Sequence, residues 1–270
     1  MPHSIRWSVF TKPWPDRSLP ELGGFVRELG FTGIELPVRP GFPVTPETVE
    51  TLPEAARILA DCGIAIESVA GPTDERTIRA CAEADVPIIR TMVRIGEGGY
   101  LRALEDTWRA YDALVPVLDQ CGVAIGVQNH CDRWIANAMG LRYLLERYDP
   151  QHVCAVWDAA HNALNGEDPD LALDLVWSHL RMVNLKNAVW TRTNAPDEVA
   201  EWRHEWVGGR QGLASWPRVA AELVQRGYAG PICLTAEYSD HDAIERLIRE
   251  DIAFAKSLFQ ALKDELETRE

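Results

Sequence analysis

The fold is decided by one stretch that joins an apolar strand to a polar turn, Val153-Cys154-Ala155-Val156-Trp157-Asp158-Ala159-Ala160-His161-Asn162. A buried parallel strand is typically a near-continuous apolar run, so a carboxylate at its carboxyl end needs a partner or a role. Asp158 and His161 place an oxygen and a nitrogen at the end of this strand, close enough to share a metal or a small polar ligand. For the motif by itself a second interpretation stays open, in which Asp158 caps the next turn and His161 bonds to the backbone.

On both sides of this stretch the chain alternates short apolar runs with amphipathic segments. We predict strands at residues 5–10, 33–36, 64–69, 87–92, 123–127, 153–157, 181–185 and 231–235, helices between them, and a long polar loop over 190–212. Eight such units without a linker predict an α/β protein, a single (β/α)8 TIM barrel that forms one domain over residues 1–270. A doubly wound open sheet is the second interpretation, but no Gly-rich phosphate turn follows an early strand.

Composition excludes several classes of partner. The net charge of −14 argues against a nucleic-acid surface or an anionic membrane, since both require clustered Lys and Arg. The six cysteines include no CxxC pair, which is typical of small core residues in a reducing compartment. No signal peptide is visible, and no apolar run approaches the roughly 18 residues of a membrane span. We therefore expect a soluble, cytoplasmic protein that binds a small-molecule substrate, and neither nucleic acid nor membrane.

Polar residues stand at the ends of four consecutive predicted strands, the fifth to the eighth: Gln128, Asp158, Asn184 and Glu237. In a (β/α)8 barrel the carboxyl ends of the strands carry the chemistry. Neighbouring strands lie about 4.8 Å apart, so four such side chains can meet around a single centre. The sequence therefore predicts a polar site at this end of the barrel.

These motifs resemble the xylose-isomerase-like TIM barrel superfamily, in particular the sugar phosphate isomerase/epimerase type. The resemblance covers essentially the whole chain. It is carried by Gly33-Ile34-Glu35-Leu36, Val127-Gln128-Asn129-His130, Asp158-Ala159-Ala160-His161, Val183-Asn184-Leu185-Lys186-Asn187, Gly208-Gly209-Arg210-Gln211-Gly212 and Ala236-Glu237.

The resemblance implies a metal site, with His161 as a substrate contact, and a homodimer. Members of the family hold one divalent metal with Glu, Asp, His and Glu from four consecutive strands, positions that correspond here to Gln128, Asp158, Asn184 and Glu237. Gln128 replaces the first Glu and Asn184 replaces the His, so the metal site is degenerate. Two carboxylates and two amide oxygens suit Mg²⁺, Mn²⁺ or Ca²⁺ better than Zn²⁺, and the lost charge makes binding weak or absent.

The same substitutions limit the mechanism. A Gln amide is neutral and cannot accept a proton, so two-base epimerisation across the substrate carbon is disfavoured. We expect one-base chemistry, in which Glu237 removes a proton α to a carbonyl while Lys186 and His161 stabilise the enediolate. Return of the proton to the neighbouring carbon makes the protein an isomerase, and loss of a β-hydroxyl makes it a dehydratase.

Four further residues are candidates for substrate binding: His130, Trp14, His204 and Arg210. Each has a structural alternative, namely a loop hydrogen bond, a dimer contact or a solvated loop. Glu35 at the end of the second strand is interpreted as a structural carboxylate rather than a metal ligand.

Three functional classes were compared. The first is a metal-assisted isomerase or dehydratase of a sugar or a polyhydroxy-keto compound. The alternative is a metal-free, catalytically reduced barrel that binds a small molecule or a partner, which Gln128 and Asn184 also fit. A DNA-repair enzyme of the endonuclease IV type is excluded, because the ends of the third and fourth strands carry no His ligand and the chain is acidic.

Overall fold

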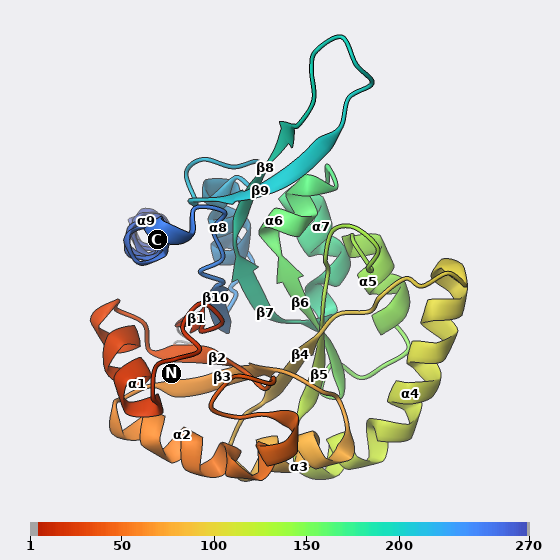
Figure 1. The fold of residues 1–270 in the computed structure, drawn as a ribbon, viewed down its shortest axis with the longest axis vertical. Coiled ribbons are helices and arrows are strands. Elements are labelled where there is room, and N and C mark those ends of the chain that lie inside the picture. The colour runs from red at the N-terminus through yellow and green to blue at the C-terminus, as the bar shows by residue number, and fades with distance from the viewer. Residues whose placement is uncertain (1–4, 269–270) are drawn as a thin grey trace.

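Eight parallel strands close into a barrel (Figure 1). The structure, a computed structural model, describes residues 5–268, so the first four and last two residues of the predicted domain lie outside it. The strands are β1 (Arg6–Phe10), β2 (Gly33–Pro37), β3 (Ala65–Ala70), β4 (Ile88–Thr91), β5 (Ala124–Gln128), β6 (Val153–Asp158), β7 (Leu180–Leu185) and β10 (Pro231–Leu234). Closure comes from β1, which pairs with both β2 and β10. The predicted barrel is confirmed, and the open sheet is wrong.

Helices surround the barrel (Figure 1). They are α1 (Leu19–Glu28), η1 (Pro46–Thr51), α2 (Leu52–Asp61), α3 (Glu75–Glu83), α4 (Gly99–Cys121), α5 (Ala138–Leu145), α6 (Ala159–Leu164), α7 (Pro169–Val176), η2 (Trp177–His179), α8 (Trp216–Gln225), η3 (His241–Ala243) and α9 (Ile244–Glu267). A capping box begins α1, where the Glu21 carboxylate accepts the Ser18 backbone N–H at 3.0 Å. Within the described residues, no helix combines the length and the apolar character needed to cross a membrane.

The interior of the barrel is closely packed. A small apolar cluster fills it: Phe10, Ala70, Ile88, Val156, Met182 and Cys233. Gly126 in β5 makes room for two members of this cluster, because a Cβ there would lie 2.7 Å from Val156 and 2.8 Å from Ile88. The polar side chains at the carboxyl ends of the strands therefore lie above a packed layer of apolar side chains.

The segment predicted as a long loop over 190–212 is instead largely an antiparallel hairpin. Its strands are β8 (Asn187–Arg192) and β9 (Trp202–Val207), paired from Asn187 with Val207 to Arg192 with Trp202. Figure 1 shows the hairpin projecting away from the barrel. The strands escaped prediction because charged residues interrupt their Trp, Thr and Val positions, so the period-two signal is weak.

The side chain of Asn187 forms hydrogen bonds with the segment that follows this hairpin. Its side-chain amide donates to the carbonyls of Gly209 and Ala214 at 2.8 and 2.9 Å, and its oxygen accepts the N–H groups of Ala188 and Ala214. Gly212 must lack a side chain, since a Cβ there would lie 2.0 Å from the Asn187 oxygen. These buried hydrogen bonds hold the backbone of residues 209–214 against the segment that follows β7.

We expect Asn187→Ala to destabilise the fold by about 2–4 kcal/mol, because it leaves several buried backbone groups without partners. Urea unfolding would measure the change. The control is Gln211→Ala in the same segment, whose exposed side chain makes no hydrogen bond within residues 5–268 and should cost less than about 0.5 kcal/mol. Equal effects of the two substitutions would contradict the role of Asn187.

Candidate functional site

A buried ion pair spans the barrel at the carboxyl ends of β2 and β4. The Arg90 guanidinium lies 2.7 Å from a Glu35 carboxylate oxygen, and Ser68 donates to the same carboxylate at 2.9 Å. The Glu35 side chain is 0% exposed and that of Arg90 6%. A charge in a buried strand is tolerated only when it is paired. The burial of Glu35 therefore requires Arg90, and the burial of Arg90 requires Glu35. The interpretation of Glu35 as a structural carboxylate agrees with this position.

Gln128 connects the ion pair to Asp158. Its side-chain oxygen accepts a hydrogen bond from Arg90 at 2.6 Å, and its amide nitrogen donates to Asp158 Oδ2 at 2.9 Å. A Glu at this position could still accept from Arg90, but it would meet Asp158 as a second anion. Gln128 therefore suits this position, because its amide can accept from Arg90 and donate to Asp158 at the same time.

Asp158 caps α6 with its other oxygen. Oδ1 accepts the backbone N–H groups of Ala160 and His161 at 3.0 and 3.1 Å. Burial raises the pKa of Asp158 from its ordinary 3.8 to about 6, although the nearby charge of Lys186 and the backbone hydrogen bonds act in the opposite direction. Both carboxylate oxygens are thus engaged by protein donors.

Glu237 is held between two ammonium groups. Lys186 donates to Oε2 at 2.8 Å, and Lys12 donates to Oε1. Burial acts to raise the pKa of Glu237, but the two lysines outweigh it and bring the pKa down to about 2. The Lys186 ammonium also lies 3.4 Å from the ring centroid of Trp206, which is a cation–π contact. Ala236, just before Glu237, has φ +51°, an uncommon backbone conformation of the kind that clusters at functional sites.

The imidazole rings of His130 and His161 lie against each other, with centroids 4.0 Å apart and a tilt of 33° between their planes. His161 Nδ1 accepts the Cys131 N–H at 3.1 Å, and burial lowers the pKa of His161 well below 6.5, so its proton is on Nε2. His130 Nδ1 donates to the Cys131 carbonyl at 2.9 Å, and burial lowers its pKa as well. The pair therefore presents one donor nitrogen and one acceptor nitrogen.

Asn184 in β7 is 1% exposed and lies next to Asp158 in the register of β6 and β7. Among the described residues, its side-chain oxygen has no hydrogen-bond donor. A buried acceptor without a partner costs free energy, so this oxygen is available to a ligand.

The structure places the four residues predicted as metal ligands at the same end of the barrel, but their donor atoms do not fit a divalent cation. Asp158 and Glu237 have every carboxylate oxygen bonded to a protein donor, and the Gln128 oxygen is bonded to Arg90. Only the Asn184 oxygen is free. The charges of Lys186 and Arg90 also oppose a metal ion there.

Two other groups of side chains have the composition and spacing to hold a metal ion: His130, Cys131 and His161, and Cys131, Asp132 and His204. In the first group, both imidazole Nδ1 atoms are already hydrogen-bonded to the Cys131 backbone. Burial raises the pKa of the Cys131 thiol to about 12, so the thiolate that binds metals is disfavoured.

The remaining predicted substrate contacts are dispersed. His204 lies on β9 between Trp190 and Trp206, at centroid distances of 5.9 and 4.6 Å. Trp14 is 9% exposed and packs edge-on against Phe25. Arg210 stacks on Phe254 of α9 at 3.7 Å. Of these, only His204 belongs to the aromatic group around Trp206, and the packing of Trp14 and Arg210 gives no support to a role in substrate binding.

Two further charged residues of this region, Arg90 and Lys12, were not among the predicted site residues. A signal for Arg90 was present, since Ile88-Ile89-Arg90 puts a charge into a buried strand and thereby requires an anionic partner such as Glu35. Lys12 follows the end of β1, where a barrel places functional residues.

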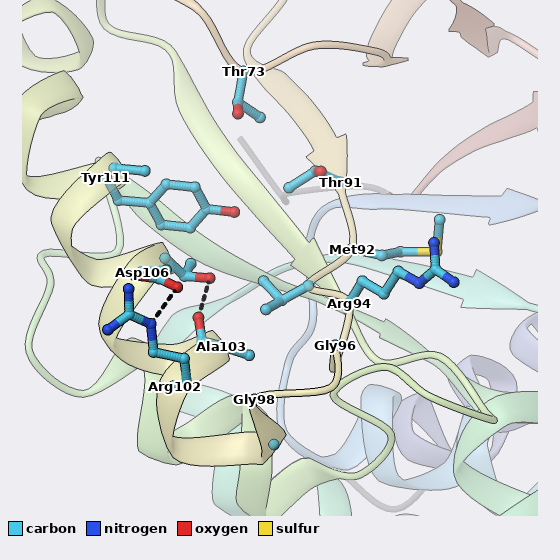
Figure 2. Close-up of a pocket in the computed structure, with 14 residues that line it drawn as sticks. Thr73, Thr91, Met92, Arg94, Gly96, Gly98, Arg102, Ala103, Asp106 and Tyr111 are labelled. Carbon is cyan, nitrogen blue, oxygen red and sulfur yellow. Dashed lines mark hydrogen bonds and ion pairs between the residues drawn. The ribbon is translucent and has the colours of Figure 1, made fainter.

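A cavity of about 510 Å³ lies beside this region, between the segment after β4 and helix α4 (Figure 2). Figure 2 shows the Tyr111 hydroxyl directed from α4 toward Thr91. The cavity is lined by none of the residues predicted for the site, and no Trp lines it. We therefore assign the candidate site to the charged strand ends and not to this cavity.

Several solved structures share the fold. The probable 3-DHS dehydratase AsbF from Bacillus anthracis, involved in petrobactin synthesis, matches with a TM-score of 0.69 at 15% identity, over 92% of this chain and 97% of its own. D-Psicose 3-epimerase from Clostridium cellulolyticum H10 matches at 0.66 and 14%, over 94% and 99%. The 3-keto-D-glucoside 4-epimerase YcjR from E. coli matches at 0.70 and 13%, over 94% and 100%. At such identities the likeness shows the fold alone.

No curated protein sequence matches the chain. A family model described as xylose isomerase-like TIM barrel matches residues 24–258, which is well over half of the sequence.

We expect Asp158 to make stability depend on pH. The folded-state pKa of Asp158, about 6, lies above the ordinary 3.8. The contribution of this group to the free energy of unfolding is therefore complete below pH 3.8 and is lost as the pH rises through about 6. Relative to Asp158→Asn, the wild type should lose about 3 kcal/mol of unfolding free energy between about pH 4 and pH 7. Urea unfolding at both pH values measures this difference. A difference that is constant with pH would contradict the raised pKa.

Proposed function

The chain belongs to the xylose isomerase-like TIM barrel family, as its strand-end motifs predicted, and from this premise we propose that it is an isomerase or dehydratase of a sugar or a polyhydroxy-keto compound. The proposal is supported by the activities of the structurally similar proteins named above, which are two sugar epimerases and a probable dehydratase. Each of these reactions alters a carbon–hydrogen or carbon–oxygen bond of a polyhydroxylated compound.

One observation carries the proposal: Glu237 stands between Lys12 and Lys186, with both ammonium groups in contact with its carboxylate. Of the two carboxylates among the four strand-end residues, Asp158 is fully buried and held by backbone and amide donors. The Glu237 side chain is 23% exposed and is the more accessible of the two carboxylates. We assign it as the single base.

In this mechanism Glu237 removes a proton from the carbon α to the substrate carbonyl, and the electron pair moves onto the carbonyl oxygen. Lys186 and the Nε2–H of His161 donate to that oxygen and stabilise the enediolate. As Lys186 turns from Glu237 to the substrate, the carboxylate loses a hydrogen bond and becomes a stronger base. Returning the proton to the neighbouring carbon, while the hydroxyl proton of the original α carbon passes to the enediolate oxygen, completes an isomerisation. Giving the proton from Glu237 to a departing β-hydroxyl, which leaves as water, completes a dehydration.

We propose that cationic side chains supply the charge that a divalent metal would supply. Lys186 and Lys12 pair with Glu237, and Arg90 pairs with Glu35 and Gln128. The same closed set of pairs also favours the alternative, a catalytically reduced barrel that binds a small molecule without turnover. Proton exchange separates the two, because only the enzyme labels its ligand.

We expect Glu237→Gln to lower deuterium exchange at the carbon α to the carbonyl by about a hundredfold or more, since it removes the proposed base. Incubation in D₂O with a panel of ketoses and keto sugar acids, followed by NMR, measures the exchange. The matched control is Glu245→Gln, an exposed carboxylate paired with Arg17, which should keep the wild-type rate. Absence of exchange with the wild type across the panel would favour the binding protein.

We also expect the wild type to give no Mn²⁺ binding heat up to about 1 mM in titration calorimetry, because its ligand oxygens are occupied. The double variant Gln128→Glu/Lys186→Met adds a carboxylate and removes an ammonium, so it should bind Mn²⁺ at least about tenfold more tightly. Stoichiometric binding by the wild type in the micromolar range would contradict the metal-free mechanism.

A further inference from the structure

Arg39 is a cation at the barrel mouth that has no anionic partner among residues 5–268. Its backbone is fixed, because the N–H of Arg39 donates to Val44 and that of the preceding Val38 donates to Ala70. The guanidinium carbon lies 5.7 Å from the ring centroid of Phe10, the last residue of β1, and the residue is half-buried. In the part of the chain that the structure describes, this guanidinium makes neither an ion pair nor a hydrogen bond.

A second cation lies over the same ring. The guanidinium carbon of Arg90 is 4.8 Å from the Phe10 centroid, and its charge opposes that of Arg39. Burial lowers the pKa of Arg39, and the charge of Arg90 lowers it further, while Glu35 and Glu237 act in the opposite direction. Arg90 already has Glu35 as its partner, whereas Arg39 has no carboxylate in contact.

The charges of this cluster do not balance. It contains four cationic side chains and three anionic ones: Lys12, Arg39, Arg90 and Lys186, with Glu35, Asp158 and Glu237. One positive charge is left over, although the whole chain carries −14. A ligand with a single negative charge would neutralise the cluster.

A second unsatisfied group points to the same ligand. The buried side-chain oxygen of Asn184 accepts no hydrogen bond from any described residue. An amide oxygen requires a donor such as a hydroxyl, and a guanidinium requires an acceptor such as a carboxylate. A polyhydroxylated acid carries both.

We propose that Arg39 binds the carboxylate of an acidic sugar, while a hydroxyl of the same substrate donates to Asn184 Oδ1. The assignment rests on the proposed function and narrows its substrate class to sugar acids. A carboxylate carries the one negative charge that the cluster lacks, and its two oxygens match the fork of a guanidinium. Arg39 thus selects the substrate, and Glu237 reacts with it.

The test compares three probes by ligand-observed NMR titration of the full chain: gluconate, the neutral sorbitol and sorbitol 6-phosphate. We expect gluconate to bind the wild type about tenfold or more tightly than sorbitol, which is the contribution of one charge-assisted contact. Arg39→Met should remove this preference, and Arg39→Lys should restore part of it, since the charge returns without the fork.

The matched control is Arg94→Met, an exposed arginine at the neighbouring cavity, which should keep the full preference for gluconate. Three results would each overturn the assignment: equal binding of gluconate and sorbitol by the wild type, an unchanged preference in Arg39→Met, or no binding of any probe. Tighter binding of sorbitol 6-phosphate than of gluconate would overturn the choice of a carboxylate.

These measurements do not require turnover. A protein that prefers gluconate through Arg39 but exchanges no substrate proton retains the anion site and loses the proposed reaction. A protein that exchanges protons but does not distinguish gluconate from sorbitol retains the reaction and loses the role of Arg39.

Discussion

Gln128 lies between a donor, Arg90, and an acceptor, Asp158, and its amide serves both at once. The resulting chain runs from Ser68 through Glu35 and Arg90 to Asp158, and it joins five neighbouring strands of the barrel, from β2 to β6. Removing one partner of a buried ion pair costs about 3–5 kcal/mol, so each member of the chain constrains the others. The positions of Glu35, Arg90 and Asp158 at the barrel mouth depend on this constraint.

The same chain accounts for the directions of the donor atoms of the four strand-end residues. The oxygens that a cation would need are turned toward protein donors, and Lys186 and Lys12 contact the second carboxylate. In the proposed mechanism, ammonium and guanidinium groups therefore supply the positive charge that polarises the substrate carbonyl. These groups also donate hydrogen bonds, which makes them suited to an oxyanion.

Besides the buried hydroxyl of Ser8 in β1, two groups of the site have no hydrogen-bond partner among the described residues, the Asn184 oxygen and the Arg39 guanidinium. Their chemistry is complementary, since the first accepts a hydrogen bond and the second binds an anion. The adjacent imidazoles of His130 and His161 add a donor and an acceptor whose tautomers are fixed by the backbone of Cys131. Most hydrogen-bonding groups of this site are paired with other residues of the protein. A ligand must therefore complement the few groups that are not.

The sequence by itself determined the barrel, because period-two apolar runs, caps and short connections are local signals that agree with one another. It also located Gln128, Asp158, Asn184 and Glu237 at one end, since strand ends follow from strand positions. It did not reveal the β8–β9 hairpin. The two strands pair with each other although neither shows a regular alternation of apolar and polar residues. Only the tertiary structure decided what the polar residues do: Glu35 and Arg90 are 55 positions apart, and Lys12 and Glu237 are 225 apart. Closure of the barrel creates these pairs, and no local pattern encodes which donor meets which acceptor.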